Sequence, residues 1–233
     1  MMHGYSLNNH YRKNAIIIMF IISLALNALL FVLVNSLFDS LEEKFDIFSK
    51  IFEFCDRIGI GLNIFTVTTL FGLIYILFDK FFWKIKAIQN LHNIPNLNGD
   101  WYGYIESSYK DEDGNSITKG VTVNIVQTWT KITIKSSFSE TSSSFSNSAS
   151  FDINNLEGPK LTFTYENNAN VPNWEIQKHE GCNILIYNEN TLNGRYFTNR
   201  GKGTHGIIFL TKVEDISEEI KNNKMKPFLI NQL

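Results

Sequence analysis

The chain has 233 residues and carries 21 Lys and Arg against 23 Asp and Glu, so its formal net charge at pH 7 is −2. This balance, and the lack of a concentrated basic stripe in the polar part, argue against binding to DNA or RNA polymers. The averages hide a division into an apolar N-terminal third and a polar remainder, so composition is informative only segment by segment.

Two apolar runs dominate the N-terminal third. Residues 15–37 and 59–78 contain no Asp, Glu, Lys or Arg. At about 1.5 Å of rise per residue, helices of these lengths reach roughly 34 and 30 Å, which matches a hydrocarbon core of about 30 Å. A signal peptide followed by a buried helix is the alternative, but the first run is longer than a signal peptide and lacks a small-residue cleavage site. The pattern predicts two transmembrane helices.

The charges around these runs predict their orientation. Cations lie outside both runs, at Arg12, Lys13, Lys80, Lys84 and Lys86, whereas residues 39–56 carry six acids and two lysines. Positively charged flanks stay in the cytoplasm. We therefore expect a multi-pass membrane protein with both termini in the cytoplasm.

Polar side chains inside the two runs are candidate contacts between helices. The candidates for contacts within an oligomer are Asn27, Asn63, Thr66 and Thr69. Such a side chain contributes about 1 kcal/mol in lipid, so these residues bias association without forcing it. The same residues can instead pair the two helices of one hairpin.

The rest of the chain is long enough for one further domain. We divide the sequence into a two-helix anchor at residues 1–86 and a cytosolic ligand-binding domain at residues 87–233. Cys55 falls in the external connector and Cys182 in the cytosolic domain, so the predicted topology keeps the two thiols apart. Two cysteines and isolated histidines do not supply the four ligands of a closed zinc site, so we expect no metal.

The cytosolic domain is predicted to be a succession of short strands. Its β-branched and aromatic residues recur between clusters of Gly, Asn, Asp and Ser. The predicted strands are residues 101–109, 117–127, 130–137, 145–153, 160–166, 182–187, 191–198 and 204–212, with 174–178 as a further candidate. Residues 136–150 include nine serines, which we interpret as a polar strand pair joined by a loop. A short helix is expected at residues 215–222.

Eight strands without intervening helices predict an all-β fold, either an up-and-down antiparallel barrel or a sandwich. The barrel is preferred because closure removes exposed strand edges. A barrel of about eight strands also has room for core side chains or one small ligand. The expected fold is therefore a membrane-anchored all-β protein with two N-terminal helices, a minimal β-barrel and a short C-terminal helix.

A Gly-x-Trp-x-Gly pattern opens the first predicted strand, at Gly99, Trp101 and Gly103. It is similar to the opening strand of lipocalin-like ligand-binding barrels. Glycine lets the chain enter a barrel at a sharp angle, and the tryptophan closes one end of the interior. We interpret Trp101 as a core plug and not as a ligand contact.

This opening strand, the two apolar runs, and residues 192–200 leading into residues 206–210 together resemble one bacterial family. Over residues 15–212 the chain resembles the SMODS-associated two-transmembrane β-strand-rich effectors of CBASS antiphage defence. The resemblance implies a β-barrel receptor for a cyclic di- or trinucleotide made by a partner CD-NTase. It also implies that binding drives self-association of the helices, disruption of the bacterial inner membrane and abortive-infection cell death.

Such a ligand needs cations or amide groups for its phosphates and flat partners for its bases. The ligand-binding candidates are Tyr102, Tyr104, Trp129, Arg195, Tyr196, Thr198 and Arg200, with Trp174 and Lys202 as additional candidates. Strand alternation separates them, because Tyr196 and Thr198 share one face of their strand and Arg195 lies on the other. These residues therefore cannot all line one interior.

Two of these assignments have alternatives. If Trp101 points inward, alternation turns Tyr102 and Tyr104 outward unless a bulge intervenes. Arg200 has a rival role as the cation that covers Trp101, in which case its loss harms folding.

No enzymatic motif occurs in the sequence. There is no Gly-x-Ser-x-Gly elbow, Walker loop, histidine pair at metal-binding spacing or carboxylate dyad. We therefore expect no catalytic residues and no cofactor. The alternative to an effector is a non-lytic membrane tether or scaffold whose barrel holds a protein or lipid partner.

Overall fold

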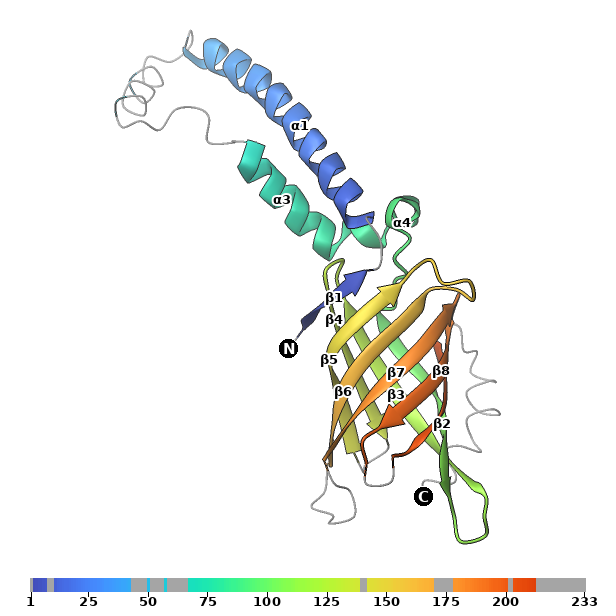
Figure 1. Ribbon diagram of the computed structural model, residues 1–233. Helices are drawn as coiled ribbons and strands as arrows, with labels where there is room; N and C mark the ends of the chain where they lie inside the picture. The colour runs from blue at the N-terminus through green and yellow to red at the C-terminus, as the bar shows by residue number, and fades with distance from the viewer. Residues whose placement is uncertain are drawn as a thin grey trace, which may run out of the picture. The chain divides into compact units, whose positions relative to one another are not determined.

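The computed structural model describes residues 2–7, 11–42, 50, 57, 67–138, 142–169, 178–200 and 203–212 (Figure 1). The chain divides into two compact units. His10–His92 form a helical unit, and Met1–Asn9 together with Asn93–Leu233 form a β unit. The N-terminal segment therefore belongs with the β unit, whereas our domain boundary assigned residues 1–86 to the anchor.

The helical unit is built on two helices that pack against each other, α1 (Tyr11–Glu42) and α3 (Val67–Lys80). The rings of Phe20 and Phe71 meet edge to face between them, with centroids 6.1 Å apart. Residues Arg12–Leu33 have a mean hydropathy of 2.9 and are long and apolar enough to cross a membrane. An N-terminal helix suited to membrane association is therefore present, as predicted.

The second predicted span is described only in part. Its residues 67–78 lie in α3, whereas residues 59–66, with Asn63 and Thr66, lie outside the described residues. Two spans, and helix contacts through Asn27 in α1 and Thr69 in α3, stay predictions.

Two short helices follow α3 in the described part of this unit. They are η1 (Phe82–Lys84) and α4 (Lys86–His92). The His92 ring donates from Nε2 to the Trp83 carbonyl 3.0 Å away, and burial lowers the pKa of His92. The neutral imidazole therefore ties the end of α4 back to η1.

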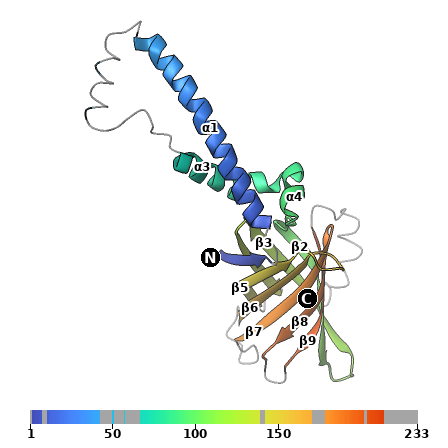
Figure 2. The same ribbon diagram turned by 45° about the horizontal axis from the view of Figure 1, so that its top comes forward.

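Nine strands close into one barrel (Figure 1, Figure 2). They are β1 (His3–Leu7), β2 (Gly99–Lys110), β3 (Ser116–Gln127), β4 (Lys131–Phe138), β5 (Ser142–Asp152), β6 (Lys160–Ala169), β7 (His179–Asn188), β8 (Thr191–Thr198) and β9 (His205–Lys212). Their order around the barrel is β1-β4-β3-β2-β9-β8-β7-β6-β5. The barrel prediction is confirmed over the sandwich, and β2 to β9 correspond to the eight predicted strands. Residues 174–177, the helix expected at residues 215–222, and Cys55 lie outside the described residues.

The ninth strand, β1, corrects our expected count of about eight. It lies between β4 and β5, antiparallel to β4 through His3 opposite Ile132 and parallel to β5 through Tyr5 opposite Ala149. β4 and β5 pair directly only from residues 135–138 to residues 142–145. Beyond that point β1 pairs with both strands, so it closes the barrel.

A serine side chain stabilises the place where β4 and β5 separate. The pairing of β5 with β6 shifts register between Ser146 and Ser148. The Ser146 Oγ accepts a hydrogen bond from the Ile134 backbone N–H at 2.9 Å and bonds the His3 ring nitrogen Nε2 at 2.7 Å. One hydroxyl therefore links β4, β5 and β1, and the serine-rich segment forms the polar strand pair that its composition predicted.

An apolar cluster fills the barrel end where β2 begins. Trp101 is fully buried and donates from Nε1 to the Leu97 carbonyl at 2.9 Å, which confirms it as a core plug. Gly99 has φ of 121°, in the region that favours glycine, and a Cβ at Gly103 would collide with the Phe209 carbonyl oxygen. Both glycines of the Gly-x-Trp-x-Gly motif are thus explained by backbone geometry.

Tyr5 anchors β1 in this cluster. Its hydroxyl donates to the Trp129 carbonyl at 2.7 Å, and its ring meets Phe151 edge to face at 5.5 Å. We expect Tyr5→Ala to lower the free energy of unfolding by about 3 kcal/mol, because it leaves a cavity and frees β1. Tyr5→Phe should cost only about 1 kcal/mol, the value of one hydrogen bond.

The measurement is denaturant unfolding of the full chain in detergent, followed by tryptophan fluorescence. Ser6→Ala, an exposed position on the same strand, is the control and should leave stability unchanged. Equal stability of Tyr5→Ala and Ser6→Ala would mean that β1 does not close the barrel in solution.

Candidate ligand-binding site

The interior of the barrel changes character from one end to the other. Next to Trp101, most of the fully buried side chains are apolar, among them Leu97, Trp129, Ile132, Leu161 and Leu192. The buried Gln127 at this end accepts a hydrogen bond from the Leu97 backbone N–H at 2.9 Å. The opposite end, here called the hairpin end, is where β2 joins β3, β4 joins β5, β6 joins β7 and β8 joins β9 (Figure 1). Toward the hairpin end the inward positions of β4 to β8 become polar, whereas β3 and β9 keep apolar inward side chains such as Val121 and Ile208.

We call these buried inward side chains the polar layer. None is more than 8% exposed, and they are Ser136, Ser142, Ser144, Ser146, Tyr165, Asn167, Asn183 and Tyr196. Strand pairing brings them together, since Ser144 lies opposite both Ser136 and Asn167, and Ser146 lies opposite Tyr165. The layer offers hydroxyl and amide groups without a formal charge.

Two tyrosines form the aromatic part of the polar layer. Burial raises the pKa of Tyr165 and of Tyr196, and the nearby Tyr196 phenol adds to the effect on Tyr165. A hydrogen bond from Ser107 acts against this shift at Tyr196. Each ring faces a glycine, because a Cβ at Gly181 would collide with the Tyr165 phenol and one at Gly206 would come within 2.7 Å of the Tyr196 ring. The glycines leave room for both rings inside the barrel.

Asn167 carries an acceptor that the described residues do not satisfy. Its side chain is 2% exposed, and its Oδ1 has no hydrogen-bond partner within the described part of the chain. A buried polar atom without a partner costs about 1–3 kcal/mol, so native proteins rarely keep one without a reason. A ligand that donates a hydrogen bond at this position is one such reason.

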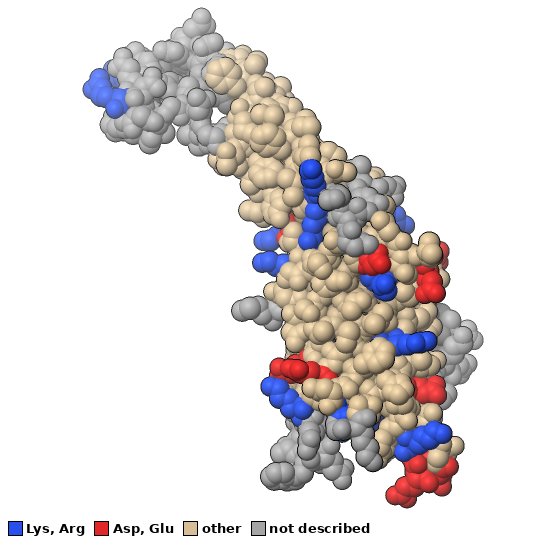
Figure 3. Space-filling model, viewed as in Figure 1, with Lys and Arg blue, Asp and Glu red and all other residues tan. Residues whose placement is uncertain are grey.

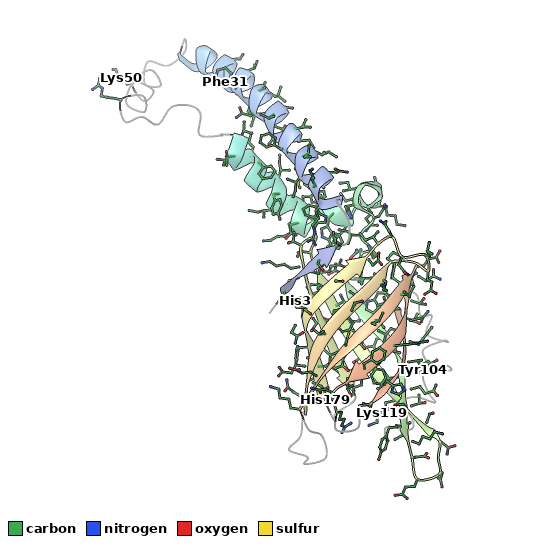
Figure 4. The ribbon with its side chains drawn as sticks, in the orientation of Figure 1. His3, Phe31, Lys50, Tyr104, Lys119 and His179 are labelled. Atoms are coloured by element: carbon green, nitrogen blue, oxygen red, sulfur yellow. The ribbon has the colours of Figure 1, made fainter. Side chains whose placement is uncertain are left out.

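Cationic and polar side chains occupy the hairpin end beyond the polar layer. Lys119 on β3 and His179 on β7 share the inward alternation of their strands, and both lie at this end in Figure 4. Thr198, also on the inward alternation, bonds Thr204 between their hydroxyls at 2.7 Å. These residues place positive charge and hydroxyls next to the neutral layer.

The structure brings together two of the seven ligand candidates, Tyr196 and Thr198. Tyr102, Tyr104 and Arg195 lie on outward positions, as alternation with an inward Trp101 requires. Tyr104 stacks on Phe209 outside the barrel, with ring centroids 5.8 Å apart.

The remaining candidates lie elsewhere. Trp129 is fully buried at the apolar end, in the turn between β3 and β4, and Arg200 is exposed after β8. Trp174 and Lys202 lie outside the described residues. The ligand-binding role of all seven candidate residues stays a prediction.

Sequence reasoning missed most of the polar layer. The available signal was the inward row of β6, which passes from Leu161 and Phe163 to Tyr165 and Asn167. A strand that changes from apolar to polar on its buried face indicates a polar interior at that end. The serines of β5 carry the same signal, which composition alone presents as a low-complexity segment.

A closed, largely antiparallel barrel with an apolar plug at one end and a buried polar layer at the other has the features of a small ligand-binding barrel. The chain belongs to the family of Cap15 cyclic dinucleotide receptor domains, whose family model matches residues 92–212. This finding confirms the predicted relationship to CBASS effectors.

Two curated relatives carry the same name, CD-NTase-associated protein 15. The protein from Yersinia aleksiciae is 27% identical over 160 residues, which cover 66% of this chain and 74% of the relative. The protein from Staphylococcus schleiferi is 32% identical over 151 residues, which cover 63% of this chain and 76% of the relative.

The buried phenols of Tyr165 and Tyr196 predict that the free energy of unfolding falls at alkaline pH. An unfolded tyrosine ionises near pH 10, whereas Tyr165 and Tyr196 have raised pKa values in the fold. The unfolded chain therefore loses these protons first, so stability is complete below about pH 10 and falls as pH rises above it. Tyr165→Phe should reduce this fall.

Unfolding free energies of the full chain between about pH 8 and pH 11 test this. Tyr109→Phe, at a position 59% exposed, is the control and should keep the wild-type fall. A Tyr165→Phe profile identical to that of the control would contradict the buried, neutral phenol.

Proposed function

We propose that this chain is a CBASS effector that binds a cyclic di- or trinucleotide through the polar layer at the hairpin end. The observation that carries the proposal is the buried polar layer, with the unsatisfied Asn167 Oδ1, inside a cyclic dinucleotide receptor domain. Binding promotes self-association of the N-terminal helices, which disrupts the bacterial inner membrane and kills the infected cell. The partner that supplies the ligand is a CD-NTase, in keeping with the names of both relatives.

The residues of the polar layer suit the bases of such a ligand. Asn167 Oδ1 accepts a hydrogen bond from an N–H group on a base edge, and the serine hydroxyls both donate and accept. The Tyr165 and Tyr196 rings supply flat apolar surface for stacking. Neutral phenols avoid repulsion from the phosphates, and the raised pKa values keep them neutral.

The phosphates need positive charge, which the neutral layer lacks. Lys119 at the hairpin end and Arg200 in the turn after β8 are the cations we assign to this task, and the His179 ring is a further hydrogen-bonding group at this end. One or two such contacts are enough for a small cyclic anion. A polymer would need a longer basic surface.

β1 is the element we assign to transmit binding toward the membrane. Ser146 lies in the polar layer opposite Tyr165 and bonds His3 of β1 at 2.7 Å. The chain continues from β1 into α1 within four residues, from Leu7 to Tyr11. A ligand shifts the balance between resting and associated states only if it binds the associated state more tightly, so contacts near Ser146 must differ between the two.

The proposed effector is not an enzyme and has no cofactor. Its activity is a change in association driven by binding energy, which requires no nucleophile, acid or base. In this proposal both termini lie in the cytoplasm, where a nucleotide second messenger is made.

Replacing Asn167 with leucine separates ligand recognition from stability. Removing a buried unsatisfied acceptor should raise the free energy of unfolding by about 1 kcal/mol. The same change should weaken nucleotide binding at least about tenfold, because one hydrogen bond is lost. Asn168→Leu, at the next and exposed position of β6, is the matched control and should keep wild-type affinity.

Calorimetric titration of the full chain in nanodiscs with several cyclic di- and trinucleotides measures the affinities. A nucleotide that binds Asn167→Leu as tightly as wild type would show that the polar layer is not the binding site. Loss of stability in Asn167→Leu would instead mean that Asn167 has a structural role.

Dye release from liposomes tests the effector activity itself. Liposomes that contain the full chain should release dye only when the cognate nucleotide is added, because binding drives the association that damages the bilayer. A mutant with Asn167→Leu should require at least about tenfold more nucleotide. Tight binding without release would favour the non-lytic tether.

A further inference from the structure

The outer surface of the barrel carries an apolar patch centred on β9, which we call the β9 face. It consists of Tyr104, Ile184, Phe197, Ile207 and Phe209, which lie on the neighbouring strands β2, β7, β8 and β9. All but Tyr104 are between 36% and 46% exposed. In the view of Figure 3, much of the barrel surface over β6 to β8 is likewise uncharged.

One cation and one carboxylate lie on either side of Ile207, on the two strands that pair with β9. Arg195 on β8 lies opposite Ile207, and Ile207 lies opposite Glu106 on β2. Neighbouring strands are about 4.8 Å apart, so the backbones of Arg195 and Glu106 lie about 10 Å apart with Ile207 midway. In the part of the chain that the structure describes, neither side chain has an ion-pair partner.

We propose that the β9 face binds the β9 face of a second copy of this chain, about a two-fold axis that runs along β9 over Ile207. Such an axis exchanges β8 and β2, so Arg195 of each copy faces Glu106 of the other. Ile207 and Phe209 meet their own counterparts, and Tyr104 faces Asn193. This proposal rests on the proposed function, because it names the surface through which activated barrels associate.

Charge complementarity is what selects a second copy as the partner. A two-fold interface must be self-complementary, so a cation on one side of the axis requires an anion at the matching distance on the other. Arg195 and Glu106 meet that condition about Ile207. In this arrangement Arg195, which lies on an outward position of β8, forms an ion pair with Glu106 of the second copy. Its contact with ligand stays a prediction.

The size of the β9 face fits association that depends on ligand and membrane. A patch three to four strands wide covers a few hundred Å² per copy, below the roughly 800 Å² that each partner of a stable complex buries. Confinement of anchored copies to one bilayer raises their effective concentration and offsets this deficit. We therefore expect monomers in dilute detergent and dimers on a membrane with nucleotide.

Cross-linking at the axis is the first test. In a full-length Cys55→Ser, Cys182→Ser background, Ile207→Cys places two thiols against each other across the axis. Val126→Cys is the matched control, because Val126 is also 46% exposed but lies on β3, outside the β9 face. With nucleotide in liposomes, mild oxidation should give a covalent dimer of Ile207→Cys and leave Val126→Cys monomeric.

The second test exchanges the charges at positions 195 and 106. Mass photometry in nanodiscs and liposomes measures the self-association of each variant. Arg195→Glu or Glu106→Arg alone creates two like-charged pairs per dimer and should weaken association at least about tenfold. The double variant restores both pairs and should associate like wild type. A mixture of the two single variants should also associate, since each supplies the charges that the other needs.

The outcomes separate this proposal from the proposed function. Dye release by wild type, without a dimer of Ile207→Cys or without rescue in the double variant, would overturn the β9 face and leave the effector intact. Nucleotide titration in dilute detergent, where the chain is expected to be monomeric, should give Glu106→Arg the wild-type affinity, because Glu106 lies on an outward position of β2 and association does not contribute to binding there. Failure of the wild-type chain to bind nucleotide would overturn the proposed function. Recovery of self-association in the Arg195→Glu, Glu106→Arg double variant would still support the β9 face as the contact between copies.

Discussion

Backbone hydrogen bonding around the barrel is the constraint on which the rest of this structure depends. An unpaired strand edge leaves N–H and C=O groups without partners, and closure removes every such edge. Here β4 and β5 pair for only a few residues and then separate, so closure requires a further strand. β1 meets that requirement with two different partners, antiparallel on one side and parallel on the other.

The same closed wall holds two interiors of opposite character. Around Trp101 the side chains exclude water and supply the hydrophobic stabilisation of the domain. Toward the hairpin end, buried hydroxyls, phenols and Asn167 contribute less to stability, and one acceptor is left unsatisfied. A receptor gains from this arrangement, because groups that are costly in the free barrel become paired when a ligand enters. Hydrophobic burial at the apolar end therefore offsets the free-energy cost of the buried polar groups.

Much of the barrel could be predicted from sequence, because each of β2 to β9 alternates between a buried and an exposed face or is bounded by clear turn residues. β1 could not, since five residues with one buried aromatic, Tyr5, carry no periodic signal beside a long apolar helix. Its partners lie more than a hundred residues away, so only the fold itself reveals the pairing. The contacts within the polar layer are equally hard to predict. Asn167 lies opposite Ser144 on a neighbouring strand, and no local sequence pattern indicates this pairing.

The position of β1 ahead of α1 and of every other barrel strand has a consequence for biosynthesis. β1 leaves the ribosome before α1, yet the strands that pair with β1 end only at Phe138 and Asp152. β1 therefore stays without its barrel partners while α1 and more than a hundred residues in all are translated. Sealing of the barrel is thus a late, long-range step, and translation of the helix precedes completion of the receptor.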